Sequence, residues 1–192
     1  MDIRSYEAQV RLRDGTPGRI RAIRPSDKDG LRWGFSQLSA EAIYHRFFQS
    51  KRELSDPELA YLTEVDFTDH VALVLELEVD GVMRIVGVGR LVRLQGPSRA
   101  NRAEVAFTVG DEFQGRGVGT QLLDHLARLG PGLGITQFEA EVLADNRQML
   151  EVFEHSGLAV SERVREGLIH VELGLGGRPG LETGGGGGGG GG

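Results

Sequence analysis

The sequence predicts a single α+β domain in which a mostly antiparallel sheet leads into a β-α-β unit. Residues 71–79, 82–94 and 102–109 are rich in β-forming residues, and Asp80-Gly81 between the first two is a typical hairpin turn. Apolar residues then recur at helical spacing over 118–129, and alternation returns over 138–142. A strand meander followed by a helix and a returning strand is therefore expected.

The first third of the chain predicts a hairpin followed by three short helices. Residues 7–13 and 19–23 are the expected strands, with the turn residues 14–18 between them. A helix is expected after Pro25, a second one capped by Ser39, and a third capped by Asp56 with Pro57 in its first turn.

The last third predicts one more helix and one more strand. The helix is expected over 146–156, ended by Gly157, and the strand over 168–173. We expect the domain to span residues 1–175. Residues 176–192, which end in the glycine run 184–192, are interpreted as a Gly-rich tail or an interdomain linker.

Composition narrows the class of protein. A formal net charge of −6 argues against a nucleic-acid partner, and no apolar stretch approaches the roughly 20 residues that a membrane helix needs. The chain contains no cysteine, and its five histidines show no metal-ligand spacing, so thiol chemistry and a metal site are not expected. The N-terminus lacks a secretory signal, which favours a cytoplasmic location.

The most informative segment is a glycine-rich stretch between an expected strand and helix. Its glycines permit positive φ angles and a close approach of a ligand to backbone N–H groups, which favour an anion at a helix N-terminus. A nucleotide P-loop would need lysine where Arg116 stands, and a dinucleotide fingerprint would need glycine at Thr120. Another pyrophosphate-containing ligand is therefore expected.

The remaining pattern is Q-x-x-G-x-G, formed by Gln114, Gly117 and Gly119. It resembles the coenzyme A loop of the GNAT acetyltransferase family, and residues 146–158 resemble the family's second block. The resemblance covers roughly residues 73–173 and implies the GNAT fold, with a β-α-β core that binds coenzyme A and with flanking helices.

Within this family, the chain resembles the bacterial Pat-type protein lysine acetyltransferases. Residues 23–27, 38–39, 44–48 and 104–109 carry this likeness. It implies acetyl-CoA as the acyl donor and, as partner, a protein with an exposed lysine, such as an acyl-CoA synthetase. It also implies a linked second domain beyond the glycine tail.

The resemblance assigns roles to individual residues. Glu104 is the implied general base. The implied cofactor-binding residues are Phe107, Thr108 and Val109 through their backbone, the loop residues Gln114, Gly115, Arg116, Gly117, Val118, Gly119 and Thr120, and Asn146 from the next helix. Many GNAT enzymes have a tyrosine acid where this chain has Phe153, so that acid is absent here.

Glu104 also stands out from its strand pattern. It shares a face with Ala106 and Thr108, whose small side chains leave room for a substrate, and partial desolvation should make it a better base. The alternative is an ordinary solvated strand glutamate. At the level of function, the alternatives are acetylation of a small amine and a non-catalytic module that senses acyl-CoA.

Overall fold

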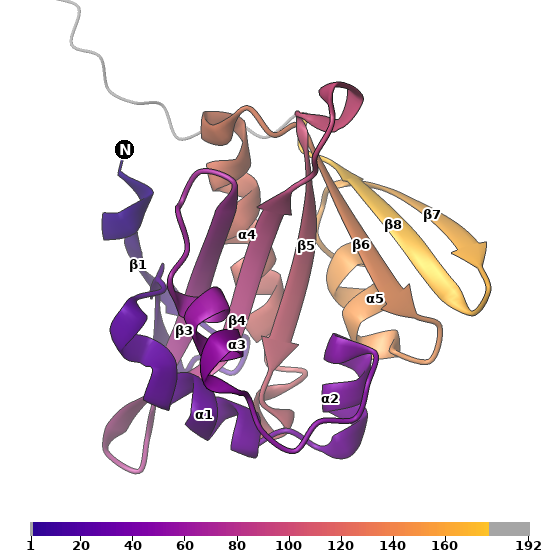
Figure 1. Ribbon diagram of the computed structural model, residues 1–192. Helices are drawn as coiled ribbons and strands as arrows, with labels where there is room; N and C mark the ends of the chain where they lie inside the picture. The colour runs from indigo at the N-terminus through magenta and orange to yellow at the C-terminus, as the bar shows by residue number, and fades with distance from the viewer. Residues whose placement is uncertain (1, 177–192) are drawn as a thin grey trace, which may run out of the picture.

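The computed structural model describes residues 2–176, which form one eight-stranded sheet with helices on both faces (Figure 1). The strands are β1 (Glu7–Arg11), β2 (Pro17–Ala22), β3 (His70–Val79), β4 (Val82–Arg93), β5 (Arg102–Val109), β6 (Gln137–Leu143), β7 (Ala159–Arg165) and β8 (Leu168–Gly174). The α-helices are α1 (Lys28–Ser36), α2 (Ala40–Phe47), α3 (Asp56–Thr63), α4 (Val118–Leu129) and α5 (Arg147–Glu154). The predicted α+β class is confirmed.

The strand order is β1-β2-β3-β4-β5-β6-β8-β7. The predicted hairpin β1–β2 and the predicted antiparallel meander β3–β4–β5 are joined by an antiparallel pairing of β2 with β3, and β5 then pairs with β6 in parallel. Helix α4 connects these two parallel strands, as the change from strand to helix periodicity predicted. The expected tail, residues 176–192, lies outside the described residues from residue 177 onward.

Strand β7 was missed in the sequence. All of its side chains are exposed except that of Val160, which is half-buried, so the strand shows no alternation of apolar and polar residues. It pairs only with β8, at the edge of the sheet. The turn between the two strands, Glu166-Gly167, has φ angles of 49° and 82° and was the one local signal of a hairpin.

The two faces of the sheet have separate cores. Leu122 and Leu126 of α4 pack on one face together with Phe138 of β6. Phe35 of α1 and Leu59 of α3 pack on the other face. In Figure 1, α1, α2 and α3 lie in front of the sheet and α4 lies behind it.

The starts of the short helices follow their capping residues. The Oγ of Ser39 accepts a hydrogen bond from the backbone N–H of Ala42, as predicted for the cap of α2. The expectation for α3 was wrong by one residue, because Ser55 is the cap and Asp56 is already helical. Ser55 and Glu58 form a capping box, in which each side chain accepts a hydrogen bond from the other's backbone N–H.

The feature that creates the site is the short pairing of β5 with β6. Only residues Arg102–Glu104 pair with Gln137–Glu139, and beyond this point the two strands diverge (Figure 1). Arg102 stabilises the paired end through an ion pair with the buried carboxylate of Glu139. Past Glu104, the edge of β5 that faces β6 has no partner strand.

Candidate active site

A cleft of about 590 Å³ opens where β5 and β6 diverge. Its walls come from the second half of β5, the loop into α4, the end of β6, α5 and one side of α2. The predicted site residues that line it are Glu104, Phe107, Thr108, Val109, Gln114, Gly115, Gly117, Val118, Gly119, Thr120 and Asn146. The fold therefore brings Asn146 together with residues 104–120, which lie well before it in the sequence.

The glycine loop leads into the N-terminus of α4. Gly115 and Gly117 have φ angles of +71° and +91°, which residues with a Cβ rarely adopt. Gly117 is the cap of α4 and provides no side-chain acceptor, so the first N–H groups of the helix remain available to a ligand. Gly119 serves a different purpose, since a Cβ there would lie 3.2 Å from Val152 of α5.

Arg116 is the one predicted site residue whose side chain is not part of the cleft lining. It binds back to the β1–β2 turn, where its Nε donates to Asp14 at 2.7 Å and its Nη2 donates to Thr16 at 2.9 Å. The side chain and the backbone N–H of Thr16 also donate to Asp14, and these two hydrogen bonds, followed by that from Arg116, lower the pKa of Asp14 to about 2. Arg116 therefore ties the loop to the hairpin.

Arg13 is a lining residue that the sequence analysis missed. Its backbone N–H donates to the carbonyl of Arg116 at 3.1 Å, and its side chain lies beside Gly117. Its Nη2 also lies 3.5 Å from the Oγ1 of Thr120. This places a cation next to the N–H groups of the loop, through a contact between residues more than a hundred positions apart.

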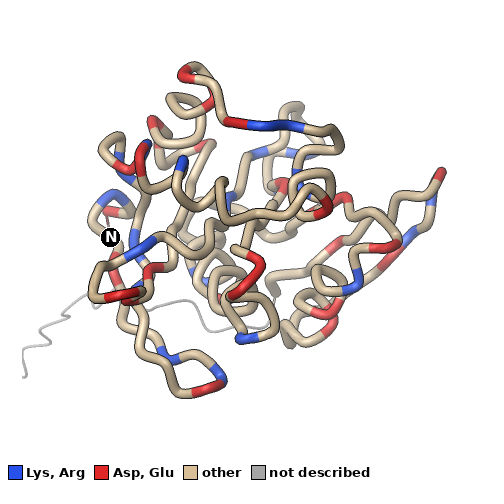
Figure 2. Tube along the Cα trace, turned by 90° about the horizontal axis from the view of Figure 1, so that it is seen from below, with Lys and Arg blue, Asp and Glu red and all other residues tan. Residues whose placement is uncertain are grey.

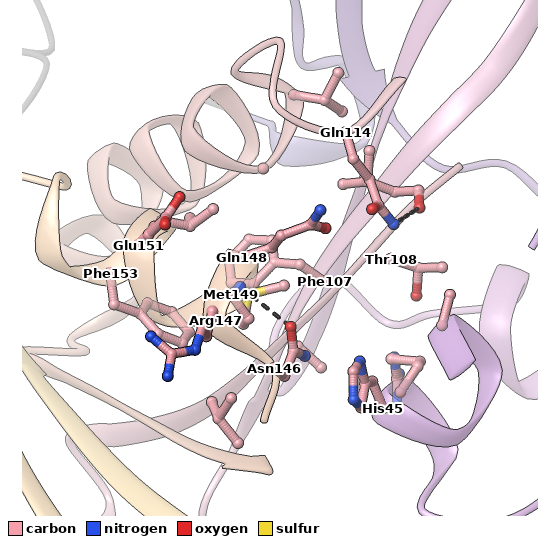
Figure 3. A pocket seen from close by; sticks show the side chains of 18 of the residues that line it. His45, Phe107, Thr108, Gln114, Asn146, Arg147, Gln148, Met149, Glu151 and Phe153 are labelled. Atoms are coloured by element: carbon pink, nitrogen blue, oxygen red, sulfur yellow. Dashed lines mark hydrogen bonds between the residues drawn. The ribbon is translucent and has the colours of Figure 1, made fainter. Parts of the chain in front are cut away.

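The inner wall of the cleft is the open edge of β5. The side chain of Gln114 reaches back to the carbonyl of Val109 at 3.4 Å (Figure 3). An extended ligand can bind to such an edge as an added strand does, through backbone hydrogen bonds.

Asn146 lies at the start of α5, on the other side of the opening. Its Oδ1 caps the helix by accepting from the backbone N–H of Met149 at 3.2 Å, which leaves its amide N–H groups for a ligand. Phe153 is almost fully buried and packs edge-on against Phe107, with 6.1 Å between ring centroids (Figure 3).

Glu104 stands at the inner end of the cleft, on the sheet face that α2 covers. Its neighbours Ala106 and Thr108 also line the cleft, as the strand pattern predicted. The expectation of partial desolvation was wrong, because the Glu104 side chain is exposed. Within residues 2–176 it forms no hydrogen bond or ion pair, so its carboxylate is available to a substrate.

Helix α2 lies across the opening and is attached on both sides. The backbone N–H of Ser39 donates to Asp111, just after β5, at 3.1 Å. At the other end, His45 Nε2 lies 3.1 Å from the carboxylate of Asp145, just before α5. Figure 3 shows His45 facing Asn146 across the cleft. The sequence analysis did not single out His45, because nothing in its own segment marks this contact.

Comparisons with known proteins agree with this geometry. The profile of the acetyltransferase (GNAT) family matches residues 39–158. The chain belongs to the GNAT acetyltransferase family. The match includes the glycine loop, the open edge of β5 and the start of α5. Among the described residues of this GNAT domain, no cluster of three or more His, Asp or Glu could hold a metal ion.

Two of the similar proteins carry the Pat name. The chain is 36% identical over 165 residues to acetyltransferase Pat of Mycolicibacterium smegmatis, covering 85% of this chain and 47% of the relative. It thus spans about half the length of that relative. The GNAT domain of S. lividans PAT superposes with a TM-score of 0.79 at 36% identity, covering 88% of this chain and 96% of that domain.

A second similar structure matches this chain over about half of its own length. The cAMP-binding acyltransferase from Mycobacterium smegmatis superposes with a TM-score of 0.61 at 32% identity. The match covers 93% of this chain and 49% of that protein.

Proposed function

We propose that this GNAT domain transfers an acetyl group from acetyl-CoA to the ε-amine of a lysine on a protein, with acyl-CoA synthetases as the expected targets. The observation that carries the proposal is that one cleft is lined by three features together. These are a helix N-terminus suited to an anion, an open strand edge, and a carboxylate that forms no ion pair in the described chain.

The residues present fit the acyl donor. The free N–H groups at the start of α4, with Arg13 beside them, suit the pyrophosphate of acetyl-CoA. The open edge at Phe107, Thr108 and Val109 suits the amide-containing pantetheine arm, and the amide of Asn146 faces the same space. The Cβ-free surface of Gly115 and Gly117 allows the close approach that this requires.

In the proposed reaction, Glu104 accepts the proton of the lysine amine. The lysine nitrogen attacks the thioester carbonyl and loses a proton to the carboxylate, while a backbone N–H of β5 stabilises the oxyanion. Collapse of the intermediate breaks the C–S bond and releases coenzyme A as the thiolate. An alkyl thiol with a pKa near 8.5 leaves without a dedicated acid, which agrees with Phe153 at the family's tyrosine position.

Direct attack in a ternary complex is favoured over a double displacement. The sequence has no cysteine that could form an acetyl-enzyme through sulfur. We further propose that the domain works in the cytoplasm and that residues 176–192 link it to a second domain, since the chain spans about half of the Pat relative.

The test supplies acetyl-CoA together with three kinds of acceptor and measures thiol release. An acyl-CoA synthetase, small amines such as free amino acids, and no acceptor are compared. Release with the synthetase, together with a mass increase of one acetyl group on a lysine, is the expected result. Thiol release with small amines but not with the synthetase would show that the acceptor is a small amine and not a protein. Binding of acetyl-CoA without thiol release would identify a sensor module.

A further inference from the structure

Two arginines are buried in the described part of the chain, and their surroundings differ. Arg21 is 5% exposed and donates to two carboxylates, those of Asp27 and Glu76. Burial alone would lower the pKa of Arg21, but these hydrogen bonds outweigh it and the pKa is raised. This is the usual arrangement, because a buried charge without a partner costs free energy.

Arg90 is buried to the same degree but has no carboxylate. It is 6% exposed and lies on β4 opposite Ala106. Its Nη1 donates to His70 Nε2 at 2.9 Å and lies 3.5 Å from the carbonyl of Leu62, and it forms no ion pair within residues 2–176. Burial, and then the charge of Arg46, lower the pKa of Arg90 to about 9.

Arg46 of α2 supplies a second such cation. Among the described residues it makes neither a hydrogen bond nor an ion pair, and its guanidinium lies 5.0 Å from the ring of its neighbour Phe47. Among acidic side chains, the charge of Glu104 acts on it most strongly. In this corner, two arginines and one carboxylate leave one positive charge without a counterpart.

Both arginines border a small cavity beside the cleft. It measures about 60 Å³, and most of its lining is apolar, including Phe35, Leu62 and Val88. Leu38, Arg46, Thr108 and Phe113 line both this cavity and the cleft. A group that reacts beside Thr108 can therefore extend toward the two guanidinium groups.

We propose that Arg46 and Arg90 form a carboxylate-binding subsite next to the acyl-transfer centre. The one positive charge that Glu104 leaves unbalanced on the two arginines can be neutralised by one monoanion. Arginine is the side chain best suited to bind a carboxylate. The small apolar cavity restricts the ligand to a short organic acid. Because Arg46 and Thr108 border the reacting position, the carboxylate belongs to one of the two reactants, and this assignment rests on the proposed acyl transfer.

Two sources share this chemistry. A donor thioester could carry the carboxylate at the far end of a short acyl group, or a small amine acceptor could carry it. In both cases the reaction is the same: the amine nitrogen forms a bond to the thioester carbonyl, the C–S bond breaks, and the amine proton leaves with a base.

The first experiment measures binding without any acyl transfer, so its result does not depend on the proposed function. Trp33 lines the small cavity and is the single tryptophan of the chain, so its fluorescence reports occupancy. Propionate and its neutral counterpart propionamide are titrated separately. Propionate should bind and propionamide should not.

Variants identify the arginines. Arg90→Met and Arg46→Met should each weaken propionate binding roughly tenfold or more. Arg46 is only partly buried, so its replacement provides the answer if Arg90→Met does not fold. Arg147→Met is the matched control, because Arg147 lines the cleft but not the small cavity. Equal binding of propionate and propionamide, or unchanged affinity in both variants, would overturn the proposal.

The second experiment identifies the source by turnover. Malonyl-CoA is compared with isovaleryl-CoA, whose acyl group has the same number of non-hydrogen atoms but no charge. With acetyl-CoA as donor, β-alanine is compared with β-alaninamide. A preference for the charged member that is lost in Arg90→Met assigns the subsite to that reactant, and no preference in either pair overturns the assignment to a reactant.

Discussion

Glu104 is the last residue of β5 that still pairs with β6, and the residues after it line the opening. Its carboxylate therefore stands at the point where the strands separate. The β4–β5 register makes Arg90 its diagonal neighbour on the same sheet face, within reach of a long side chain. At the scale of single residues, the site places one acid and two arginines around the position proposed for the reacting amine.

Replacing Glu104 tests its assignment as base. A lysine amine has a pKa near 10.4, so almost all of it is protonated at pH 7 and must lose a proton before it attacks. Glu104→Gln should lower turnover by roughly 10²- to 10⁴-fold while acetyl-CoA still binds, and the deficit should shrink as pH rises. Thiol-release kinetics and acetyl-CoA titration measure both quantities.

The matched control for that experiment is Glu112→Gln. Glu112 is exposed in the loop after β5 and does not line the cleft. Its replacement should leave turnover unchanged. Near-normal turnover of Glu104→Gln at pH 7 would show that another group accepts the proton.

His70 predicts how stability depends on pH. Burial, and then the charge of Arg90, lower the pKa of His70 to about 4, against about 6.5 in an unfolded chain. Tyr61 packs against its ring, and the charge of Asp66 only partly opposes the shift. Between pH 6.5 and 4 the unfolded chain therefore binds a proton that the folded chain does not, and stability falls as pH falls.

A variant isolates this contribution. His70→Gln keeps an acceptor for Arg90 but does not titrate, so it should lose less stability on acidification than the parent. The difference between the two free energies of unfolding should change by on the order of 2 kcal/mol from pH 7 to pH 4.5. Urea unfolding at pH 7, 5.5 and 4.5 measures it, and a difference that stays constant with pH would contradict the assignment.

At the scale of elements, α2 is the helix that borders the reacting position. Its two attachments, Ser39 to Asp111 and His45 to Asp145, fix it to both sides of the opening. Glu41 on this helix is exposed and lines the cleft, so it lies where an acceptor approaches. In our proposal, α2 therefore belongs to the side of the cleft that the acceptor approaches.

Charge reversal at Glu41 tests that placement. Glu41→Lys should raise the Michaelis constant for a protein acceptor about threefold or more, because charges at the rim of an interface steer its partner. Its affinity for acetyl-CoA should stay the same. Steady-state kinetics with the acceptor varied, and acetyl-CoA titration, distinguish the two effects.

The control for this reversal is Glu53→Lys, an exposed position that does not line the cleft. Glu58 is unsuitable, because hydrogen bonds from Lys51 and then Ser55 lower its pKa to about 2 and its reversal would damage the start of α3. Equal effects of Glu41→Lys on acceptor and acetyl-CoA would show that α2 has only a structural role.

At the scale of the whole molecule, the sheet has a hydrophobic core on each face. The cleft is lined by α2, which lies on one face, and by α4, which lies on the other. Acidic and basic residues are interspersed along the described part of the chain (Figure 2). None of the helices within residues 2–176 combines the length and apolar character needed to cross a membrane. Ligand binding in the cleft contacts β5, α4 and α5 together, so it should stabilise the fold as a unit.

Acetyl-CoA should therefore raise the melting temperature. At a hundredfold excess over its Kd, it contributes about 2.7 kcal/mol, which corresponds to roughly 5–10 °C for a domain of this size. Gly117→Val should abolish this shift, because φ is +91° at Gly117 and a Cβ would lie 3.3 Å from Arg13. Thermal unfolding with and without acetyl-CoA measures the shift for each protein.

Gly132→Ala serves as the control, since Gly132 lies outside the cleft lining and a Cβ there would meet nothing within 4 Å. It should keep the full shift. An unchanged shift in Gly117→Val would place the pyrophosphate away from the α4 loop.

The sequence by itself determined the features that depend on neighbouring residues. Alternation predicted the buried strands, Ser39 marked the start of α2, and Gly115, Gly117 and Gly119 marked the loop before α4. Each of these follows from local backbone conformation or from a repeat of two or 3.6 residues. The exposed strand β7 was missed because its side chains carry no such repeat.

Tertiary structure alone decided which distant residues meet. Arg13 lies beside the glycine loop, His45 binds Asp145, and Arg46 shares a cavity with Arg90, although long stretches of chain separate each pair. It also decided that Glu104 is exposed rather than partly desolvated. Local patterns determine the elements, but the order of strands in the sheet and the point at which two of them separate determine which side chains share a cleft.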